Sequence, residues 1–113
     1  MFDDSQMDNV FNALSHTTRR TILDHLRAKP GISVGVLAQS FDVSRIAIMN
    51  HLAVLEKAKL VISEKQGRTR LLYLNVVPIQ QIHERWSDEY RTLWANRLTS
   101  IKFAAESKRE EQK

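Results

Sequence analysis

The chain has 113 residues, of which 42% are hydrophobic and 27% charged, and its formal net charge is +4. This length suits one domain, and the complete lack of cysteine excludes disulfides, thiolate metal ligands and cysteine nucleophiles. No apolar run reaches the roughly 18 residues of a membrane span, and the acidic opening MFDDSQMD is unlike a signal peptide. The positive charge favours a polyanionic partner, although many proteins without such a partner share it.

Apolar residues recur at helical spacing through the first half of the chain and predict four helices. We expect them at residues 5–15, 18–28, 33–41 and 44–58. Serine and threonine residues stand where the later helices begin and are expected to cap them through their hydroxyls. Pro30 ends the second helix, because proline disfavours a helical conformation in the residue before it. Asp42 and Val43 form a tight turn between the third and fourth helices.

After Leu60 the pattern changes to that of a β-hairpin, expected over residues 61–75. The segments LVISEK and RTRLLYLN have strand character, and Gln66-Gly67-Arg68 between them places glycine at the tip. Pro78 then opens a long helix over residues 78–107, and the polar tail 108–113 is expected to fray. The predicted fold class is therefore mainly α with a small β-hairpin, in a single domain over residues 1–107.

The third and fourth helices have the layout of a helix-turn-helix, because the turn between them is tight and the second has a polar outward face. If Ile48, Leu52 and Leu55 are buried, the outward face carries Arg45, Ile46, Met49, Asn50 and Ala53. In a DNA major groove, arginine can bond guanine, asparagine can bond adenine, and an apolar side chain can touch the thymine methyl. The alternative is an ordinary solvent-exposed helix face on which Ile46 and Met49 happen to be exposed and have no binding role.

The hairpin carries arginines on both sides of Thr69, next to its glycine tip. Guanidinium groups on a projecting hairpin suit a narrow minor groove or the adjacent phosphates; alternatively, they protect an exposed strand edge. Serines at helix starts can contact phosphates, although capping alone would explain them. His51 could donate to a phosphate or pack under the hairpin. The predicted DNA-binding residues are Ser33, Ser44, Arg45, Ile46, Met49, Asn50, His51, Arg68, Thr69 and Arg70.

From about Val10 to Ala105, the sequence resembles the winged helix-turn-helix regulators of the ArsR type. The resemblance is carried by VFNALSHTTRRTILDHL, SVGVLAQSFDVSRIAIMNHLAVLEKAKLV and the wing SEKQGRTRLLYLN. The last helix resembles that of the branch without metal-site cysteines. The resemblance implies a winged helix-turn-helix with a C-terminal dimerisation helix. It also implies a dimer that binds operator DNA. We therefore expect a cytoplasmic homodimer that binds double-stranded DNA sequence-specifically and represses transcription from an inverted repeat.

Two positions depart from the usual pattern of that family. His16-Thr17 stands where the family usually has Asp-Pro, so the cap of the second helix is expected to be weaker, with Thr17 partly replacing it. Lys59 stands where the family often has a glycine after the recognition helix. Either Lys59 adopts a left-handed conformation, which costs roughly 1 kcal/mol, or the helix ends differently.

The long C-terminal helix carries an apolar stripe that three short helices cannot cover, and exposing it would be costly. Pairing with the same helix of a second chain, together with the first helix, would bury the stripe. The alternatives are that the helix folds back on its own domain, or that the chain is an interaction module that docks a partner protein there. The predicted dimer-interface residues are Met7, Val10, Phe11, Ile79, Ile82, Trp86, Tyr90, Leu93, Trp94, Leu98 and Ile101.

We expect no catalytic, metal or cofactor site. The third helix, where many relatives hold a metal through cysteines, reads SVGVLAQ. His83, Glu84 and Asp88 could hold a cation, but solvated surface charges are the simpler interpretation. No nucleophile, base and orienting acid stand in a recognisable motif. Thr18 and Arg19 could contribute further phosphate contacts, whereas the operator sequence and any effector ligand are not readable from the sequence.

Overall fold

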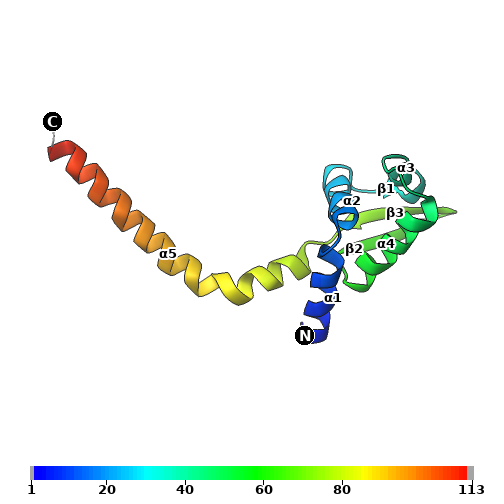
Figure 1. Cartoon of the computed structure of the whole chain (residues 1–113), viewed down its shortest axis with the longest axis horizontal. Coiled ribbons are helices and arrows are strands. Elements are labelled where there is room, and N and C mark those ends of the chain that lie inside the picture. Colours follow the sequence, from blue (N-terminus) through cyan, green and yellow to red (C-terminus); the bar gives the residue numbers. More distant parts are fainter. Residues whose placement is uncertain (1, 112–113) are drawn as a thin grey trace. The chain divides into compact units, whose positions relative to one another are not determined.

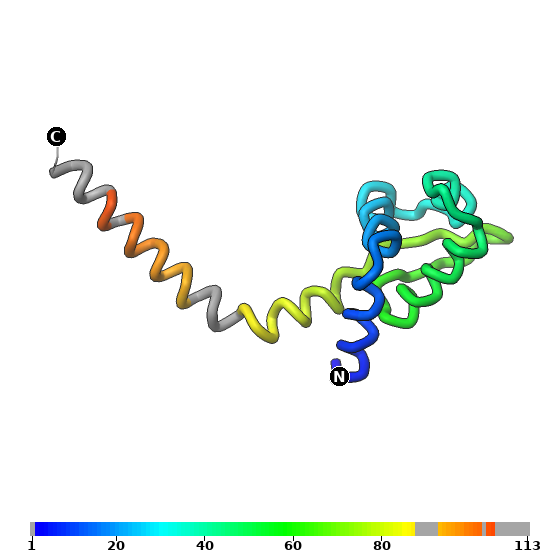
Figure 2. The backbone as a smooth tube through the Cα atoms, viewed as in Figure 1, coloured from blue at the N-terminus to red at the C-terminus, as the bar shows by residue number. Residues whose placement is uncertain are grey.

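The computed structural model describes residues 2–111, without the side chains of residues 88–92, 103 and 106–111, which are grey in Figure 2. The chain forms two compact units, Met1–Gln81 and Ile82–Lys113. Its elements are labelled in Figure 1 and follow in the order α1 (Asp4–Leu14), α2 (Thr17–Ala28), β1 (Ile32–Ser33), α3 (Val34–Gln39), α4 (Arg45–Lys57), β2 (Val61–Gln66), β3 (Thr69–Leu74) and α5 (Val77–Glu111).

The sheet has three antiparallel strands in the order β1-β3-β2, one more than the expected hairpin. The added strand, β1, pairs Ile32 with Leu72 and Ser33 with Leu71. Two residues are too few to show an alternating pattern, which is why the sequence indicates no strand before α3. Within the β2–β3 hairpin, which we call the wing, Gln66 faces Thr69, so Gly67 and Arg68 form a two-residue turn. Gly67 has a φ of 61°, as glycine has at the first position of a type II′ turn.

The core of the first unit draws on every helix of that unit and on the sheet. Ile48, Leu52 and Leu55 of α4 are fully buried, as the helical spacing predicts. Burying a side chain of this size contributes roughly 1.5–3 kcal/mol, so these three residues fix how α4 is rotated about its axis. The other large side chains that are completely covered are Val10, Ile22, Leu26, Leu37, Leu60 and Leu72.

Two of the expected helix caps are confirmed and one expectation is wrong. The Ser33 hydroxyl accepts from the Val36 N–H of α3 at 3.2 Å, and the Ser44 hydroxyl accepts from the Ala47 N–H of α4 at 3.1 Å. At α2, however, the cap is His16, whose ring Nδ1 accepts from the Thr18 N–H at 3.1 Å. A neutral imidazole nitrogen can accept in the same way as the usual serine or aspartate oxygen, so no hydroxyl is needed there.

Lys59 adopts the left-handed conformation, with a φ of 62°, and closes α4. Its N–H donates to the Glu56 carbonyl at 2.9 Å, and the Leu60 N–H donates to the Leu55 carbonyl at 3.0 Å. These two bonds form a Schellman motif, which usually has glycine in the place of lysine. The Asn75 side chain donates to the Lys59 carbonyl at 2.8 Å and so supports this strained residue.

Candidate nucleic-acid interface

The first two turns of α4 present a mixed polar and apolar surface on the side opposite the buried residues. Ile46 is 72% exposed and Met49 is 46% exposed, which is unusual for apolar side chains of this size. Arg45 and Asn50 are exposed beside them. The four predicted base-reading residues therefore all lie at the surface of the recognition helix α4.

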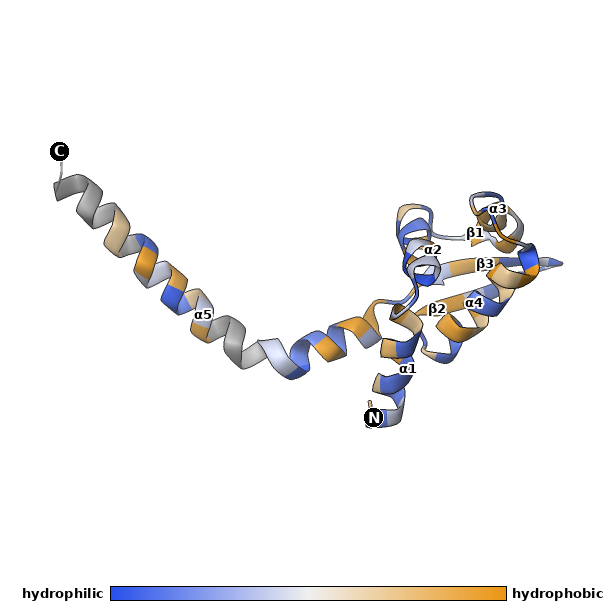
Figure 3. Cartoon of the chain, in the orientation of Figure 1, coloured by the Kyte–Doolittle hydropathy of each residue, from blue (hydrophilic) through white to orange (hydrophobic). Residues whose placement is uncertain are grey.

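The tip of the wing and the starts of α3 and α4 lie at the same end of the first unit (Figure 1). They enclose a hollow of about 300 Å³, the basic hollow, lined by Ser33, Val34, Gly35, Arg45, Met49, Arg68, Thr69 and Arg70. Three of these side chains are guanidinium groups and none is a carboxylate. The wing tip beside the basic hollow is hydrophilic (blue in Figure 3). Residues from three separate segments thus surround one electropositive concavity that suits an anion.

Arg70 is tied to the recognition helix. Its guanidinium forms an ion pair with the Glu56 carboxylate of α4, and the two side chains are 37% and 27% exposed. The pair links β3 to α4 and so helps to hold the wing in place. Within the part of the chain that the structure describes, no carboxylate lies within ion-pair distance of Arg68, which leaves that guanidinium available to an external anion.

Glu56 is a residue of this surface that sequence reasoning missed. It stands seven residues after Met49, which in turn stands four residues after Arg45. At helical spacing these three residues share one stripe of α4. Once the wing arginines are placed beside Arg45, that spacing is the signal that could have identified Glu56 as their partner.

The serines of the predicted interface are capping residues. The hydroxyl oxygens of Ser33 and Ser44 accept backbone N–H groups. A hydroxyl can accept one hydrogen bond and donate another, so each O–H group can still donate to a ligand. Ser33 lines the basic hollow together with Thr69 of the wing. A serine at either position can therefore cap its helix and contact an anion at the same time.

His51 lies against the junction of α1 and α2. The expectation that it packs under the wing is therefore wrong. Its ring centroid is 4.6 Å from that of His16, and its Nδ1 lies 3.3 Å from the guanidinium of Arg19. Burial, followed by unfavourable electrostatic interactions of the protonated ring with His16 and Arg19, lowers the pKa of His51. The ring is therefore neutral at pH 7.

The predicted dimer-interface residues fall into two groups. Met7 and Val10 of α1 are covered by the first unit itself, whereas Phe11 is 47% exposed. Along α5, Ile82 is half-buried and the side chain of Tyr90 lies outside the described residues. The remaining stripe residues are exposed by 38–64%, and they are Ile79, Trp86, Leu93, Trp94, Leu98 and Ile101. The described part of α5 therefore presents a largely uncovered apolar stripe.

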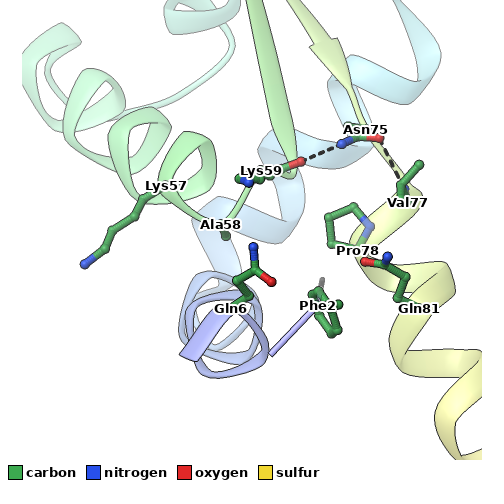
Figure 4. Close-up of a pocket in the computed structure, with 9 residues that line it drawn as sticks. All are labelled: Phe2, Gln6, Lys57, Ala58, Lys59, Asn75, Val77, Pro78 and Gln81. Carbon is green, nitrogen blue, oxygen red and sulfur yellow. Dashed lines mark hydrogen bonds between the residues drawn. The ribbon is translucent and has the colours of Figure 1, made fainter. Parts of the chain in front are cut away.

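A second hollow, of about 270 Å³, lies where α1 begins, α4 ends and α5 begins (Figure 4). The Lys57 side chain extends away from it in that view, and both ends of the Asn75 amide are occupied by bonds to the Lys59 carbonyl and the Val77 N–H. No carboxylate, imidazole or thiol lines it; its walls are Phe2, Gln6, Lys57, Ala58, Lys59, Asn75, Val77, Pro78 and Gln81. The ionisable side chains on its walls are those of Lys57 and Lys59 alone.

Among the described residues, no group of three histidine or acidic side chains could hold a metal ion. The side chain of Asp88, considered above as a cation ligand with His83 and Glu84, lies outside the described residues. None of the helices that the structure describes is both long enough and apolar enough to cross a bilayer.

Residues 14–64 match a family model described as a helix-turn-helix domain. The chain is 35% identical over 85 residues to YuzN, an uncharacterised HTH-type transcriptional regulator of Bacillus subtilis, a match that covers 70% of this chain and 92% of YuzN. It is 35% identical over 74 residues to the transcriptional repressor SdpR of the same organism, which covers 66% of this chain and 81% of SdpR.

Solved structures resemble the chain in both fold and sequence. An ArsR-like transcriptional regulator from Rhodococcus sp. RHA1 has a TM-score of 0.67 and 35% identity, over 91% of this chain and 93% of the other. The ArsR family transcriptional regulator RHA00566 has a TM-score of 0.69 and 32% identity, over 82% of this chain and 94% of the other. Both likenesses extend well beyond the matched helix-turn-helix segment.

Proposed function

The chain belongs to the ArsR-type helix-turn-helix transcriptional regulators, and from this premise we propose that it represses transcription as a homodimer bound to an inverted-repeat operator. The family regulates transcription by binding DNA and does not consist of enzymes. The observation that carries the proposal is the basic hollow, which joins the recognition helix, α3 and the wing around three arginines. The operator DNA of such a regulator lies in the cytoplasm, where we place the protein.

The recognition helix reads base edges in the major groove, which is about 12 Å wide and admits one helix. Arg45 and Asn50 supply hydrogen bonds suited to guanine and adenine, and the exposed carbons of Ile46 and Met49 meet thymine methyl groups. This division of roles accounts for apolar side chains standing exposed beside polar ones at the start of α4.

The residues around the basic hollow hold the phosphate backbone. Arg68 offers a guanidinium that no described carboxylate neutralises, and Thr69 and Ser33 offer hydroxyl groups beside it. Ser44 contributes in the same way at the start of α4, and His51 contributes on its other flank. Such contacts position the protein on the duplex without reading its sequence.

The exposed stripe of α5 pairs with the same stripe of a second chain. Trp86, Leu93 and Trp94 are each more than half exposed, and burying such side chains stabilises a dimer by roughly 1.5–3 kcal/mol each. Phe11 adds apolar surface from α1. A two-fold dimer presents two recognition helices about 34 Å apart, one turn of the duplex, which is why the proposed operator is an inverted repeat.

Arg68→Ala tests the phosphate-binding role of the wing. Each neutralised phosphate adds about 0.9 to the slope of log K against log salt. Because the dimer carries two copies of Arg68, we expect the variant to lower that slope by about 1.8. Fluorescence anisotropy with a labelled duplex at several salt concentrations measures the slope. The matched control is Arg27→Ala, which removes an exposed arginine from the last turn of α2, outside the basic hollow.

An unchanged slope in Arg68→Ala would remove the wing from the interface. If the wild-type chain itself binds no duplex at low salt, the docking of a partner protein on the aromatic face of α5 becomes the better account of this molecule.

A further inference from the structure

Arg19 of α2 connects the end of α1 to the recognition helix. Its Nε donates to the Ala13 carbonyl at 2.8 Å, and one terminal nitrogen donates to the Asn12 carbonyl at 2.9 Å. The other terminal nitrogen lies 3.3 Å from Nδ1 of His51 in α4. A single guanidinium thus bridges three elements, α1, α2 and α4.

The contact with Arg19 decides which nitrogen of His51 carries the hydrogen. A guanidinium can only donate, so Nδ1 of His51 must be the acceptor. Burial, followed by unfavourable electrostatic interactions of the protonated ring with His16 and Arg19, lowers its pKa, so the neutral form predominates at pH 7. The single hydrogen of the neutral ring is therefore on Nε2.

Nε2 of His51 reaches solvent. No described group bonds to it, and among the described residues no buried side-chain nitrogen or oxygen lacks a partner. At about 100° per residue, His51 lies on the flank of α4 opposite Met49 and Glu56, the residues turned toward the wing. His51 and the wing arginines therefore lie on opposite sides of the recognition helix.

We propose that Arg19 is a positioning residue, which fixes His51 so that its Nε2–H donates to a DNA phosphate on the side of the recognition helix away from the wing. This inference rests on the proposed function, since it places a duplex along α4. The phosphates on the two walls of the major groove are then held by different chemistry. The wing uses charged groups, whereas His51 uses a neutral donor, which releases no counterion and leaves the salt slope unchanged.

The test is a double-mutant cycle of Arg19→Lys and His51→Ala. Lysine keeps the charge of Arg19 but lacks the fork that reaches both carbonyls and the ring. One lost hydrogen bond weakens binding about fivefold. Because the dimer loses one in each protomer, we expect Arg19→Lys to weaken binding of a mixed-sequence duplex about 25-fold and to leave the salt slope unchanged. In the His51→Ala background, Arg19→Lys should cause no further loss.

The matched control is Arg20→Lys. Arg20 is the next residue of α2, and it donates to the Leu14 carbonyl at 2.7 Å and to Thr17 at 3.3 Å without reaching α4. Its variant should retain wild-type affinity. Equal losses from Arg19→Lys in both backgrounds would overturn the inference while leaving the proposed function intact, whereas a wild-type chain without affinity for duplexes would contradict the proposed function itself.

A measurement on the free wild-type protein tests the inference without any variant. The ¹⁵N signals of the His51 ring distinguish a protonated from an unprotonated nitrogen. We expect Nε2 to be protonated and Nδ1 unprotonated at pH 7, with the same pattern in Arg20→Lys. A hydrogen on Nδ1 would overturn the positioning role of Arg19, because that nitrogen could not then accept from a guanidinium.

Discussion

Individual residues at the two ends of α4 determine how the recognition helix begins and ends. Ser44 caps its start. This cap can be predicted from the sequence, because a serine directly before a helical apolar pattern is typical of a helix N-terminus. Lys59 ends it in a left-handed conformation, which the sequence leaves as one of two outcomes. His16 caps α2, but the sequence does not identify it as the cap, because histidine is not among the residues that usually cap a helix.

Lys59→Gly should raise the free energy of unfolding by about 0.5–1 kcal/mol. Glycine adopts a positive φ without the steric cost that lysine bears, and part of this gain is offset by the greater entropy of glycine in the unfolded chain. Urea denaturation of the two proteins measures the difference. The control Lys57→Gly places glycine inside the last turn of the same helix and should lower stability by about 1 kcal/mol. A loss of stability in Lys59→Gly would show that the lysine side chain matters more than the backbone conformation.

Among the helices and strands, those with several periodic residues could be predicted and the shortest could not. The buried residues of α4 follow from helical spacing alone, and Gly67 marks the tip of the wing. β1 exists only through its pairing with Leu71 and Leu72, which lie about forty residues later, so a local pattern cannot reveal it. The link between Glu56 and Arg70 is likewise a contact between distant segments.

Glu56→Gln should strengthen DNA binding and steepen its salt dependence. The Glu56 carboxylate forms an ion pair with the Arg70 guanidinium. In the proposed complex it competes with phosphate for that group, so its removal makes Arg70 available to the duplex. Because the dimer has two such pairs, we expect the slope of log K against log salt to increase by up to about 1.8. The control is Glu64→Gln, which removes the same charge from the wing at a position paired with Leu71 and therefore on the opposite sheet face from Arg70. Equal effects of the two variants would mean that only the overall charge matters.

For the molecule as a whole, the winged helix-turn-helix fold and the regulator family are both readable from the sequence, because the helical repeats, the glycine tip and the wing arginines agree with one another. The oligomeric state does not follow from these local patterns. The described apolar residues along α5 are largely exposed, and a local sequence pattern does not say which molecule they contact. We infer that a second copy pairs there, because two matching recognition helices are what an inverted repeat requires.

The most direct test of this account is to select bound fragments from a pool of random duplexes with the full-length wild-type chain. We predict that the enriched fragments share an inverted repeat whose half-sites are centred about 10 base pairs apart, one turn of the duplex. Each half-site should contain the base that Asn50 reads, so that Asn50→Ala enriches fragments with any base at that one position. A pool that stays unenriched, or that yields only single half-sites, would contradict a dimeric regulator that reads an operator through α4.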